Sequence, residues 1–274
     1  MPELPEVETV VRGLRGALIG RRIVGMWQDW PATIHSPPPD EFAARLSGQR
    51  VRALNRRGKY ILIALEFDTL VIHLKMSGRL YVTEAEEEHE ADRWVHLRFD
   101  LDNGRQLRFS DLRKFGRVYL TDDVESLLGH LGPEPLSDEF TLAGFRAGMK
   151  GRKRAIKSLL LEQEFIAGVG NIYADEALFR AGIHPATPVH LLADEDSQRL
   201  HQTIRDALRA GIEHEGASIN WYRKPDGSKG ESQDYFYVYG RANLPCRRCG
   251  AAVNKIRLAQ RGTHFCPQCQ PELL

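Results

Sequence analysis

A proline and a glutamate at the start of the chain carry its most specific chemical signal. The sequence begins Met1-Pro2-Glu3-Leu4-Pro5-Glu6-Val7-Glu8. Because the residue after Met1 is small, we expect an aminopeptidase to remove Met1 and expose the secondary amine of Pro2. A terminal α-amino group titrates near ~7.7 to 8, against ~10.4 for lysine, so part of it is an unprotonated nucleophile at neutral pH. Pro2 would attack an electrophilic carbon, and the resulting iminium, with its fixed positive charge, would withdraw electrons.

Glu3 is placed to donate a proton or to stabilise the developing cation. Apolar residues at helical spacing follow it, so the pair is expected at a helix N-terminus; they are Leu4, Val7, Val10, Val11, Leu14 and Leu18. The helix dipole would lower the pKa of the amine whereas the carboxylate would raise it, and the sequence leaves that balance open. Prolines and acids are also common at helix starts, so the octet alone has a purely structural explanation.

The cysteines form a metal-ligand pattern at the other end of the chain. Cys246 and Cys249 form one Cys-x2-Cys pair, and Cys266 and Cys269 form a second pair after sixteen intervening residues. This spacing predicts one structural Zn²⁺ with four thiolate ligands and no open position for water. Two disulfides are the alternative, but the reducing conditions of the cytoplasm disfavour disulfide bonds. Between the pairs, Gln260-Arg261-Gly262-Thr263 is the predicted hairpin tip, from which Arg261 would project toward a phosphate.

Further candidates follow predicted strands. Met76, in His73-Leu74-Lys75-Met76-Ser77-Gly78-Arg79, and Phe115, in Ser110-Asp111-Leu112-Arg113-Lys114-Phe115-Gly116, are each more often core residues. Together with Arg113 they could instead be a wedge that fills the gap left by an extruded nucleotide. Lys59 has three interpretations, a phosphate contact, a proton carrier or a surface lysine, and spacing alone favours the last.

Charge is sorted along the chain although the net charge is only +1. Three stretches, residues 50–60, 146–157 and 235–271, contain several Lys and Arg but no Asp or Glu. The acids concentrate elsewhere, most densely in residues 84–92. This segregation favours a nucleic-acid groove over a random surface. No segment is apolar enough for a membrane span, and the start of the chain is acidic, so we expect a cytoplasmic protein with no membrane partner.

The chain divides into a β-rich and a helical region. After the first helix, strands are expected at 22–26, 51–54, 60–65, 70–74, 95–101, 105–109 and 118–120, with a loop at 37–40 and a short helix at 41–46. Strands give way to helices near residues 131–135, and the expected helices are 141–150, 155–162, 172–181 and 194–215. The break Gly168-Val169-Gly170-Asn171 would present backbone amides, and residues 221–233 read as a mobile loop.

Several stretches, in order, resemble bacterial formamidopyrimidine-DNA glycosylase. They are residues 2–9, Arg57-Gly58-Lys59, residues 73–78, Leu112-Arg113-Lys114-Phe115-Gly116, residues 168–176, Val238-Tyr239-Gly240-Arg241 and the finger with Arg261. The resemblance runs from residue 2 to about residue 270. It implies an α+β fold with an N-terminal antiparallel β-sandwich and flanking helices, then a helix-two-turn-helix bundle and a β-hairpin zinc finger. The implied segments are 1–132, 133–222, 223–237 and 238–271, the third belonging to a lesion-covering loop whose full extent is 217–237.

The resemblance also implies a function in base-excision repair. The enzyme would extrude oxidised purines, chiefly 8-oxoguanine opposite cytosine and formamidopyrimidines, from damaged double-stranded DNA held between its domains. Pro2 would attack C1′, Glu3 would handle the proton that opens the sugar, Lys59 would serve β-elimination and Arg261 δ-elimination. The implied DNA-binding residues are His73, Met76, Arg113, Phe115, Arg152, Lys157 and Asn171. We expect a monomer at the bacterial nucleoid.

One position departs from the family, and two other functions remain open. Trp94 stands where a phosphate-contacting histidine is frequent, with His96 two positions on, so that contact is not carried over. Endonuclease VIII shares the architecture and acts on oxidised pyrimidines, but its start usually has glycine where Leu4 stands. The other alternative is a DNA-binding zinc module without catalysis, in which Pro2 only starts a helix.

Overall fold

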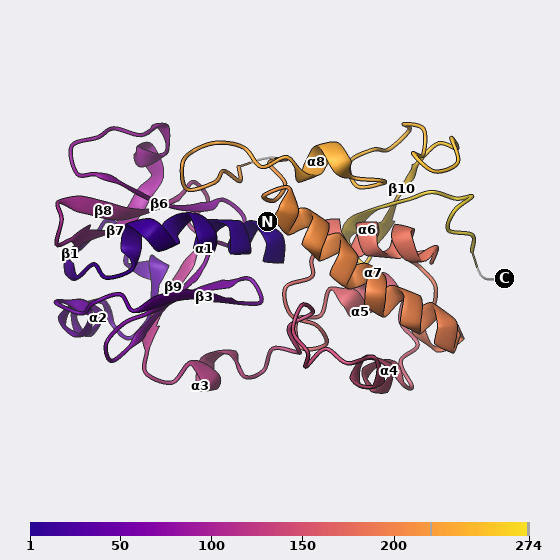
Figure 1. Cartoon of the computed structure of the whole chain (residues 1–274), viewed down its shortest axis with the longest axis horizontal. Coiled ribbons are helices and arrows are strands. Elements are labelled where there is room, and N and C mark those ends of the chain that lie inside the picture. The colour runs from indigo at the N-terminus through magenta and orange to yellow at the C-terminus, as the bar shows by residue number, and fades with distance from the viewer. Residues whose placement is uncertain (220, 273–274) are drawn as a thin grey trace. The chain divides into compact units, whose positions relative to one another are not determined.

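The computed structural model describes residues 1–219 and 221–272. The chain forms two compact units (Figure 1). The first comprises Met1–Gly129 together with Ala217–Gly230, and the second comprises His130–Gly216 and the segment that begins at Glu231. The boundaries expected from the sequence at 132, 222 and 237 remain a prediction of domain organisation.

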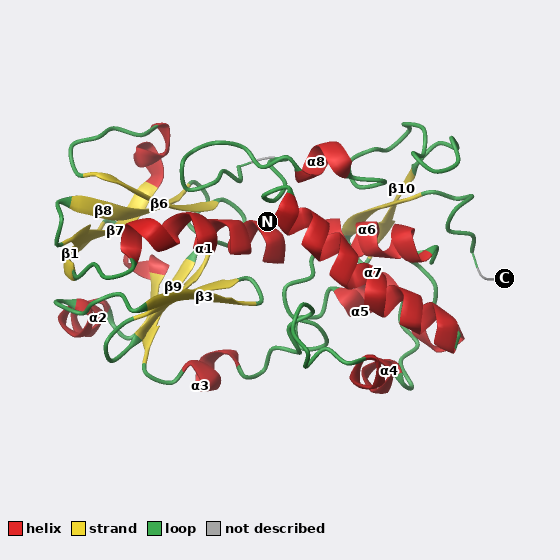
Figure 2. Ribbon diagram, in the orientation of Figure 1, coloured by secondary structure: helices red, strands yellow, loops and turns green. Residues whose placement is uncertain are grey.

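Two sheets and the first helix build the N-terminal unit (Figure 2). One sheet has the order β1-β7-β8-β6 and the other β2-β9-β5-β4-β3. The strands are β1 (Ile23–Gln28), β2 (Ile34–Ser36), β3 (Ala53–Arg57), β4 (Tyr60–Ala64), β5 (Thr69–His73), β6 (Gly78–Glu84), β7 (Val95–Leu101), β8 (Arg105–Asp111) and β9 (Arg117–Thr121). All strand pairs are antiparallel except β2 with β9.

Side-chain alternation explains these strands. In β4 and β9 every second residue is buried, which is the pattern of a strand with one face on the core. Helix α1 (Leu4–Leu18) buries the apolar stripe predicted from its 3.6-residue spacing and packs against β3, β4 and β6. Helices α2 (Pro39–Leu46) and α3 (Val124–Leu128) and the 3₁₀ turns Pro31–Thr33 and Glu90–Trp94 complete the unit.

The second unit contains the helices and the finger. Its helices are α4 (Leu142–Met149), α5 (Ile156–Leu160), α6 (Asn171–Ala181), α7 (Asp194–Glu213) and α8 (Ser232–Tyr235), with a 3₁₀ turn at Val189–Leu191. Helix α6 packs along α7 and is buried on most sides. Strands β10 (Asn254–Leu258) and β11 (Arg261–Phe265) form the hairpin of the finger.

The α+β architecture expected from the sequence is confirmed, with local corrections. Strands β2 and β6 and helix α3 were not expected, and the predicted loop at 37–40 gives way to α2 from Pro39. The hairpin tip is Ala259–Gln260, both with positive φ, instead of residues 260–263. Arg261 is therefore the first residue of β11, paired with Leu258. Part of the predicted mobile loop, Ser232–Gln233, belongs to α8. Position 220, within the expected lesion-covering loop 217–237, lies outside the described residues.

Among the residues described, no helix combines the length and the apolar character that crossing a bilayer requires.

Candidate active site

The first residues of the chain enter α1 through a hydrogen-bonded N-terminus. Pro2 is buried and Glu3, the N-cap residue, is 3% exposed. The backbone N–H of Glu3 donates to Oε2 of Glu6 at 2.8 Å, which satisfies a donor that the helix itself leaves unpaired. The other oxygen of Glu6 accepts the backbone N–H of Ala217 at 2.8 Å. The carboxylate of Glu6 thus joins the N-cap of α1 to a segment more than two hundred residues away in sequence.

Lys59 lies in the two-residue turn between β3 and β4, at one end of the sheet. The turn needs the positive φ of Gly58, and Lys59 is buried, so the surface interpretation is wrong. His73 pairs with Tyr60 in the next strand, and its Nδ1 accepts the backbone N–H of Lys75 at 2.9 Å. Burial, followed by the charges of Lys75 and Lys59, lowers the pKa of His73 to about 3. His73 is therefore neutral at physiological pH.

Asp111 organises the loop that carries the predicted wedge. It is 2% exposed, and its carboxylate accepts the hydroxyl of Ser77 at 2.5 Å and the backbone N–H groups of Phe115 and Gly116 at 2.8 and 2.7 Å. One buried acid thereby joins the turn after β8 to the turn before β6.

The three wedge candidates form one exposed cluster on these turns. The guanidinium of Arg113 lies 4.6 Å from the ring centroid of Phe115 and donates to the Met76 sulfur at 3.0 Å. Met76 and Phe115 are 43% and 46% exposed, so neither is a core residue. Large apolar side chains that are held in place yet exposed are suited to insertion between stacked bases.

In the second unit, a buried ion pair holds the finger hairpin. Lys157 and Asp175 are 2.7 Å apart and almost fully buried. Lys157 Nζ also donates to the Gly262 carbonyl at 3.1 Å, and the Asn171 amide donates to the same oxygen at 2.9 Å. Two residues predicted to bind DNA, Lys157 and Asn171, therefore hold the residue next to Arg261. Since the ammonium of Lys157 is enclosed, it would reach a phosphate only after this pair opens.

The acid after Asp175 holds a neighbouring segment. Glu176 accepts the backbone N–H groups of Tyr237, Val238 and Tyr239 at 3.0, 2.9 and 3.0 Å. Burial raises the pKa of Glu176, although the three donors act in the opposite direction.

Arg152 lies apart from the Lys157 pair. Its guanidinium donates to Glu162 Oε2 at 2.9 Å and lies over the ring of Phe165. Its side chain is 39% exposed, so it retains surface from which a phosphate can be reached.

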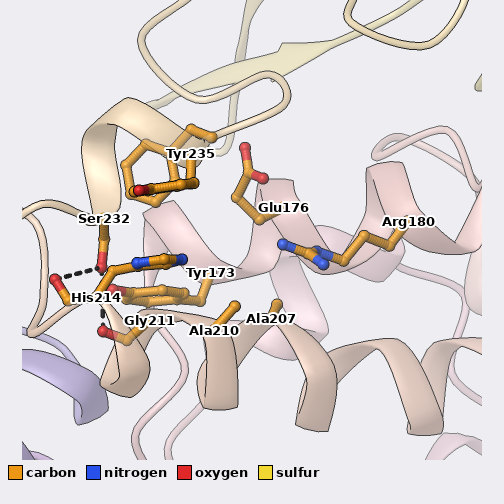
Figure 3. Close-up of a pocket in the computed structure, with 10 residues that line it drawn as sticks. Tyr173, Glu176, Arg180, Ala207, Ala210, Gly211, His214, Ser232 and Tyr235 are labelled. Atoms are coloured by element: carbon orange, nitrogen blue, oxygen red, sulfur yellow. Dashed lines mark hydrogen bonds between the residues drawn. The ribbon is translucent and has the colours of Figure 1, made fainter.

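A small pocket in the second unit contains none of the predicted site residues (Figure 3). It lies between α6, α7 and α8, where His214 and Tyr235 stack with ring centroids 3.6 Å apart. Ser232 closes one side by donating to the Gly211 carbonyl at 3.0 Å. An added Cβ at Gly211 would meet the hydroxyl of Tyr173 at 2.6 Å, so α6 and α7 pack closely at this position.

The finger brings the four cysteines together. Their Sγ atoms lie within 4.8 Å of one another, and the pairs Cys246–Cys269 and Cys249–Cys266 are 3.9 and 3.5 Å apart. These separations exclude disulfides, which need about 2 Å, and fit thiolates around one tetrahedral ion. The prediction of one structural Zn²⁺ is confirmed. The cysteine pairs precede β10 and follow β11, so the bound ion would hold the two ends of the hairpin together.

The predicted residues fall into two groups. Those of the N-terminal unit are Pro2, Glu3, Lys59, His73, Met76, Arg113 and Phe115, and those of the second unit are Arg152, Lys157, Asn171, Arg261 and the cysteines. Sequence reasoning did not select the acids that hold these residues, Glu6, Asp111, Asp175 and Glu176. A charged residue inside an apolar stretch, such as Asp175-Glu176 within α6, is the signal that could have revealed them.

Comparison with known families decides the relationship. Three protein-family models match the chain. The formamidopyrimidine-DNA glycosylase N-terminal domain matches residues 1–118, and the H2TH domain of the same glycosylase matches residues 131–223. The zinc finger found in FPG and IleRS matches residues 243–271. A formamidopyrimidine-DNA glycosylase of Chloroflexus aurantiacus is 49% identical, with 98% of both chains covered. The chain belongs to the formamidopyrimidine-DNA glycosylase family.

Solved structures of this glycosylase family agree with the assignment. The MutM (Fpg) protein of Thermus thermophilus is 41% identical and superposes with a TM-score of 0.88, covering all of both chains. Wild-type Lactococcus lactis Fpg (MutM) in complex with DNA containing N7-benzyl-Fapy-dG is 36% identical with a TM-score of 0.92, covering 99% of this chain and 100% of that one.

The lowered pKa of His73 predicts an acid-dependent stability. The folded protein binds this proton only near pH 3, whereas the unfolded chain binds it near 6.5, so unfolding takes up a proton between these values. The contribution is complete above pH 6.5 and is lost as the pH falls toward 3. For His73→Asn, which keeps an acceptor for Lys75, the free energy of unfolding should fall less on acidification, by up to about 1.4 kcal/mol per pH unit. Denaturant unfolding at pH 7.5 and 5 measures this, and identical pH dependence would contradict it.

The buried pair predicts a strong effect of removing one charge. Lys157→Met leaves the Asp175 carboxylate buried without its ammonium and should lower the free energy of unfolding by about 3–5 kcal/mol. Lys157→Met combined with Asp175→Asn should cost less, because no lone charge remains. Lys153→Met, at an exposed position four residues earlier, is the control. Thermal and urea unfolding of the zinc-loaded protein test this, and a double variant less stable than the single one would refute it.

Proposed function

We propose that this protein is a bifunctional DNA glycosylase and AP lyase of base-excision repair that removes oxidised purines, 8-oxoguanine and formamidopyrimidines, from double-stranded DNA. The observation that carries the proposal is the N-terminus of α1, where Pro2 and Glu3 precede the helix and Glu6 holds the Glu3 backbone. Membership of the family supports it, as do relatives of 43–49% identity that bear the name formamidopyrimidine-DNA glycosylase.

In the proposed mechanism the amine of Pro2, freed by removal of Met1, attacks C1′ of the damaged nucleotide. The glycosidic bond breaks and the base leaves, while Glu3 protonates the sugar oxygen as the ring opens. The iminium draws electrons from C2′ and acidifies its proton. Removal of that proton, served by Lys59, expels the 3′ phosphate in β-elimination. A second elimination, served by Arg261, expels the 5′ phosphate.

The DNA-binding residues have distinct proposed roles. Met76, Arg113 and Phe115 fill the gap in the base stack, which fits their exposure on the turns held by Asp111. Arg152 and Asn171 contact backbone phosphates, and Lys157 supports the same surface through its hold on Gly262. His73 contributes as a neutral residue beside Lys59.

Structures of relatives support damaged DNA as the substrate class. Lactococcus lactis Fpg has been solved with DNA containing Fapy-dG and with DNA containing an abasic site, at 35% identity to this chain. These are a base lesion and the product of base removal, so they match the two proposed activities. The names of the relatives favour this function over that of an oxidised-pyrimidine enzyme.

Pro2→Gly tests the nucleophile. Because the variant lacks the ring that fixes the nitrogen and makes the iminium permanently charged, borohydride should trap no adduct with an 8-oxoguanine duplex. Mass spectrometry of wild-type protein supplies an internal control, since any fraction that retains Met1 should also form none. Tight binding by the wild-type protein without any adduct would instead favour a non-catalytic DNA-binding module.

Arg261→Ala tests the second elimination. Base release should stay within about twofold of wild type, while the δ-elimination product should fall about 100-fold, the order expected for loss of one charge-stabilising donor. Arg257→Ala removes an exposed charge from the other strand of the same hairpin and should change neither step. Gel analysis of 3′ ends separates the products, and equal loss of base release and strand cleavage would disprove this role of Arg261.

A further inference from the structure

The segment after α7 is packed as part of the N-terminal unit. We call the described residues 217–219 and 221–230 the strap. Tyr222 of the strap is 7% exposed and belongs to the hydrophobic core of that unit. Trp221 packs edge-on against Trp94, with ring centroids 5.7 Å apart. The strap is therefore a docked element and not a solvent loop.

The strap also lies against α1, the helix that begins just after Pro2 and Glu3. A Cβ added at Gly13 would meet Cγ and Cδ of Pro225 at 2.9 and 3.1 Å. A proline ring cannot rotate away, so the absence of a side chain at Gly13 is what permits this contact. A Cβ at Gly16, three residues further along the helix, would meet nothing within 4 Å.

Glu6 provides a second attachment of the strap to the same helix. Its two carboxylate oxygens accept different backbone donors, the N–H of Ala217 at the start of the strap and the N–H of Glu3 at the start of the helix. Glu6 is 1% exposed, so water cannot readily replace either donor. A carboxylate held rigidly from both sides transmits a displacement on one side to the other.

We propose that Glu6 is a positioning residue that couples docking of the strap on α1 to the orientation of Pro2 and Glu3. When the strap leaves α1, Oε1 of Glu6 loses the Ala217 donor, and the carboxylate turns away from the Glu3 N–H. The catalytic terminus is then no longer aligned with the sugar. The inference rests on the proposed function, because it assigns Pro2 and Glu3 their roles.

This coupling differs from a strap that only covers a flipped base. A cover would matter while a damaged base is present and would be irrelevant to DNA that has already lost its base. A coupled strap affects the attack of Pro2 on C1′ with either substrate. An abasic duplex, which offers nothing to cover, therefore separates the two roles.

The experiment uses full-length, zinc-loaded protein with Met1 removed. Gly13→Ala pushes Pro225 from outside the site, and Gly16→Ala is its control, since both changes raise helix propensity equally. Glu6→Gln breaks the coupling, because the two N–H groups bond to different carboxylate oxygens and a carboxamide replaces one of these acceptors with an NH₂ group that only donates. Each glycine variant is made in the wild-type and Glu6→Gln backgrounds, and single-turnover borohydride trapping is measured on an abasic duplex.

We expect Gly13→Ala to slow trapping about tenfold, the scale on which small misplacement of reacting groups acts, and Gly16→Ala to leave the rate unchanged. In the Glu6→Gln background, Gly13→Ala should cause no further slowing, because the link is already broken. Thermal unfolding verifies that each variant is folded. If Gly13→Ala folds poorly, Pro225→Ala replaces it, because this substitution alters the same contact from the strap side.

Two results would overturn the coupling. In the first, Gly13→Ala protein is trapped on the abasic duplex at the wild-type rate and is slowed only in the release of 8-oxoguanine. The strap would then act only as a cover for the flipped base. The other is equal slowing by Gly13→Ala with and without Glu6. Absence of any adduct with the wild-type protein would instead reject the proposed function, so the two failures are distinguishable.

Discussion

Buried carboxylates that accept backbone N–H groups are the interaction on which the functional parts of this protein depend. Each of four acids holds a different segment. Glu6 holds the start of α1, and Asp111 holds the turn that carries Arg113 and Phe115. Asp175 holds the strand that begins at Arg261, and Glu176 holds residues 237–239. An unpaired buried N–H costs free energy, and an ionised acceptor satisfies it more strongly than a neutral one. The turn of Arg113 and Phe115 and residues 237–239 are irregular, and these acids give them the fixed geometry that helices and strands obtain from their own hydrogen-bond ladders.

The same arrangement explains why the residues around these acids differ in accessibility. Lys157 and His73 are enclosed, the first by its ion pair with Asp175 and the second by burial that keeps it neutral. Met76 and Phe115 remain exposed because Asp111 holds the backbone on which they sit and their side chains need no partner in the core. Rigidity therefore comes from inside the molecule, while the surfaces that would meet a ligand stay open.

Local patterns in the sequence predicted what depends on local interactions. The apolar spacing of α1, the bounds of β7 and the zinc ligands needed only periodicity and residue type. Strand β6 was missed because Gly78 ends a motif that looks like a loop, although it also begins the strand. The ion pair of Lys157 was missed because a lysine in a basic run resembles a surface residue, and its partner lies eighteen positions away on another helix. Non-local partners of this kind leave no periodic trace.

The path of the chain has a consequence for dissecting the protein. The backbone leaves the N-terminal unit after Gly129, returns at Ala217 and departs again at Glu231. A fragment that stops at Gly129 would thus lack Tyr222, a member of its own hydrophobic core. Expressing that half alone would yield an incompletely packed polypeptide, whereas supplying residues 217–230 as a separate peptide offers a route to reconstitution.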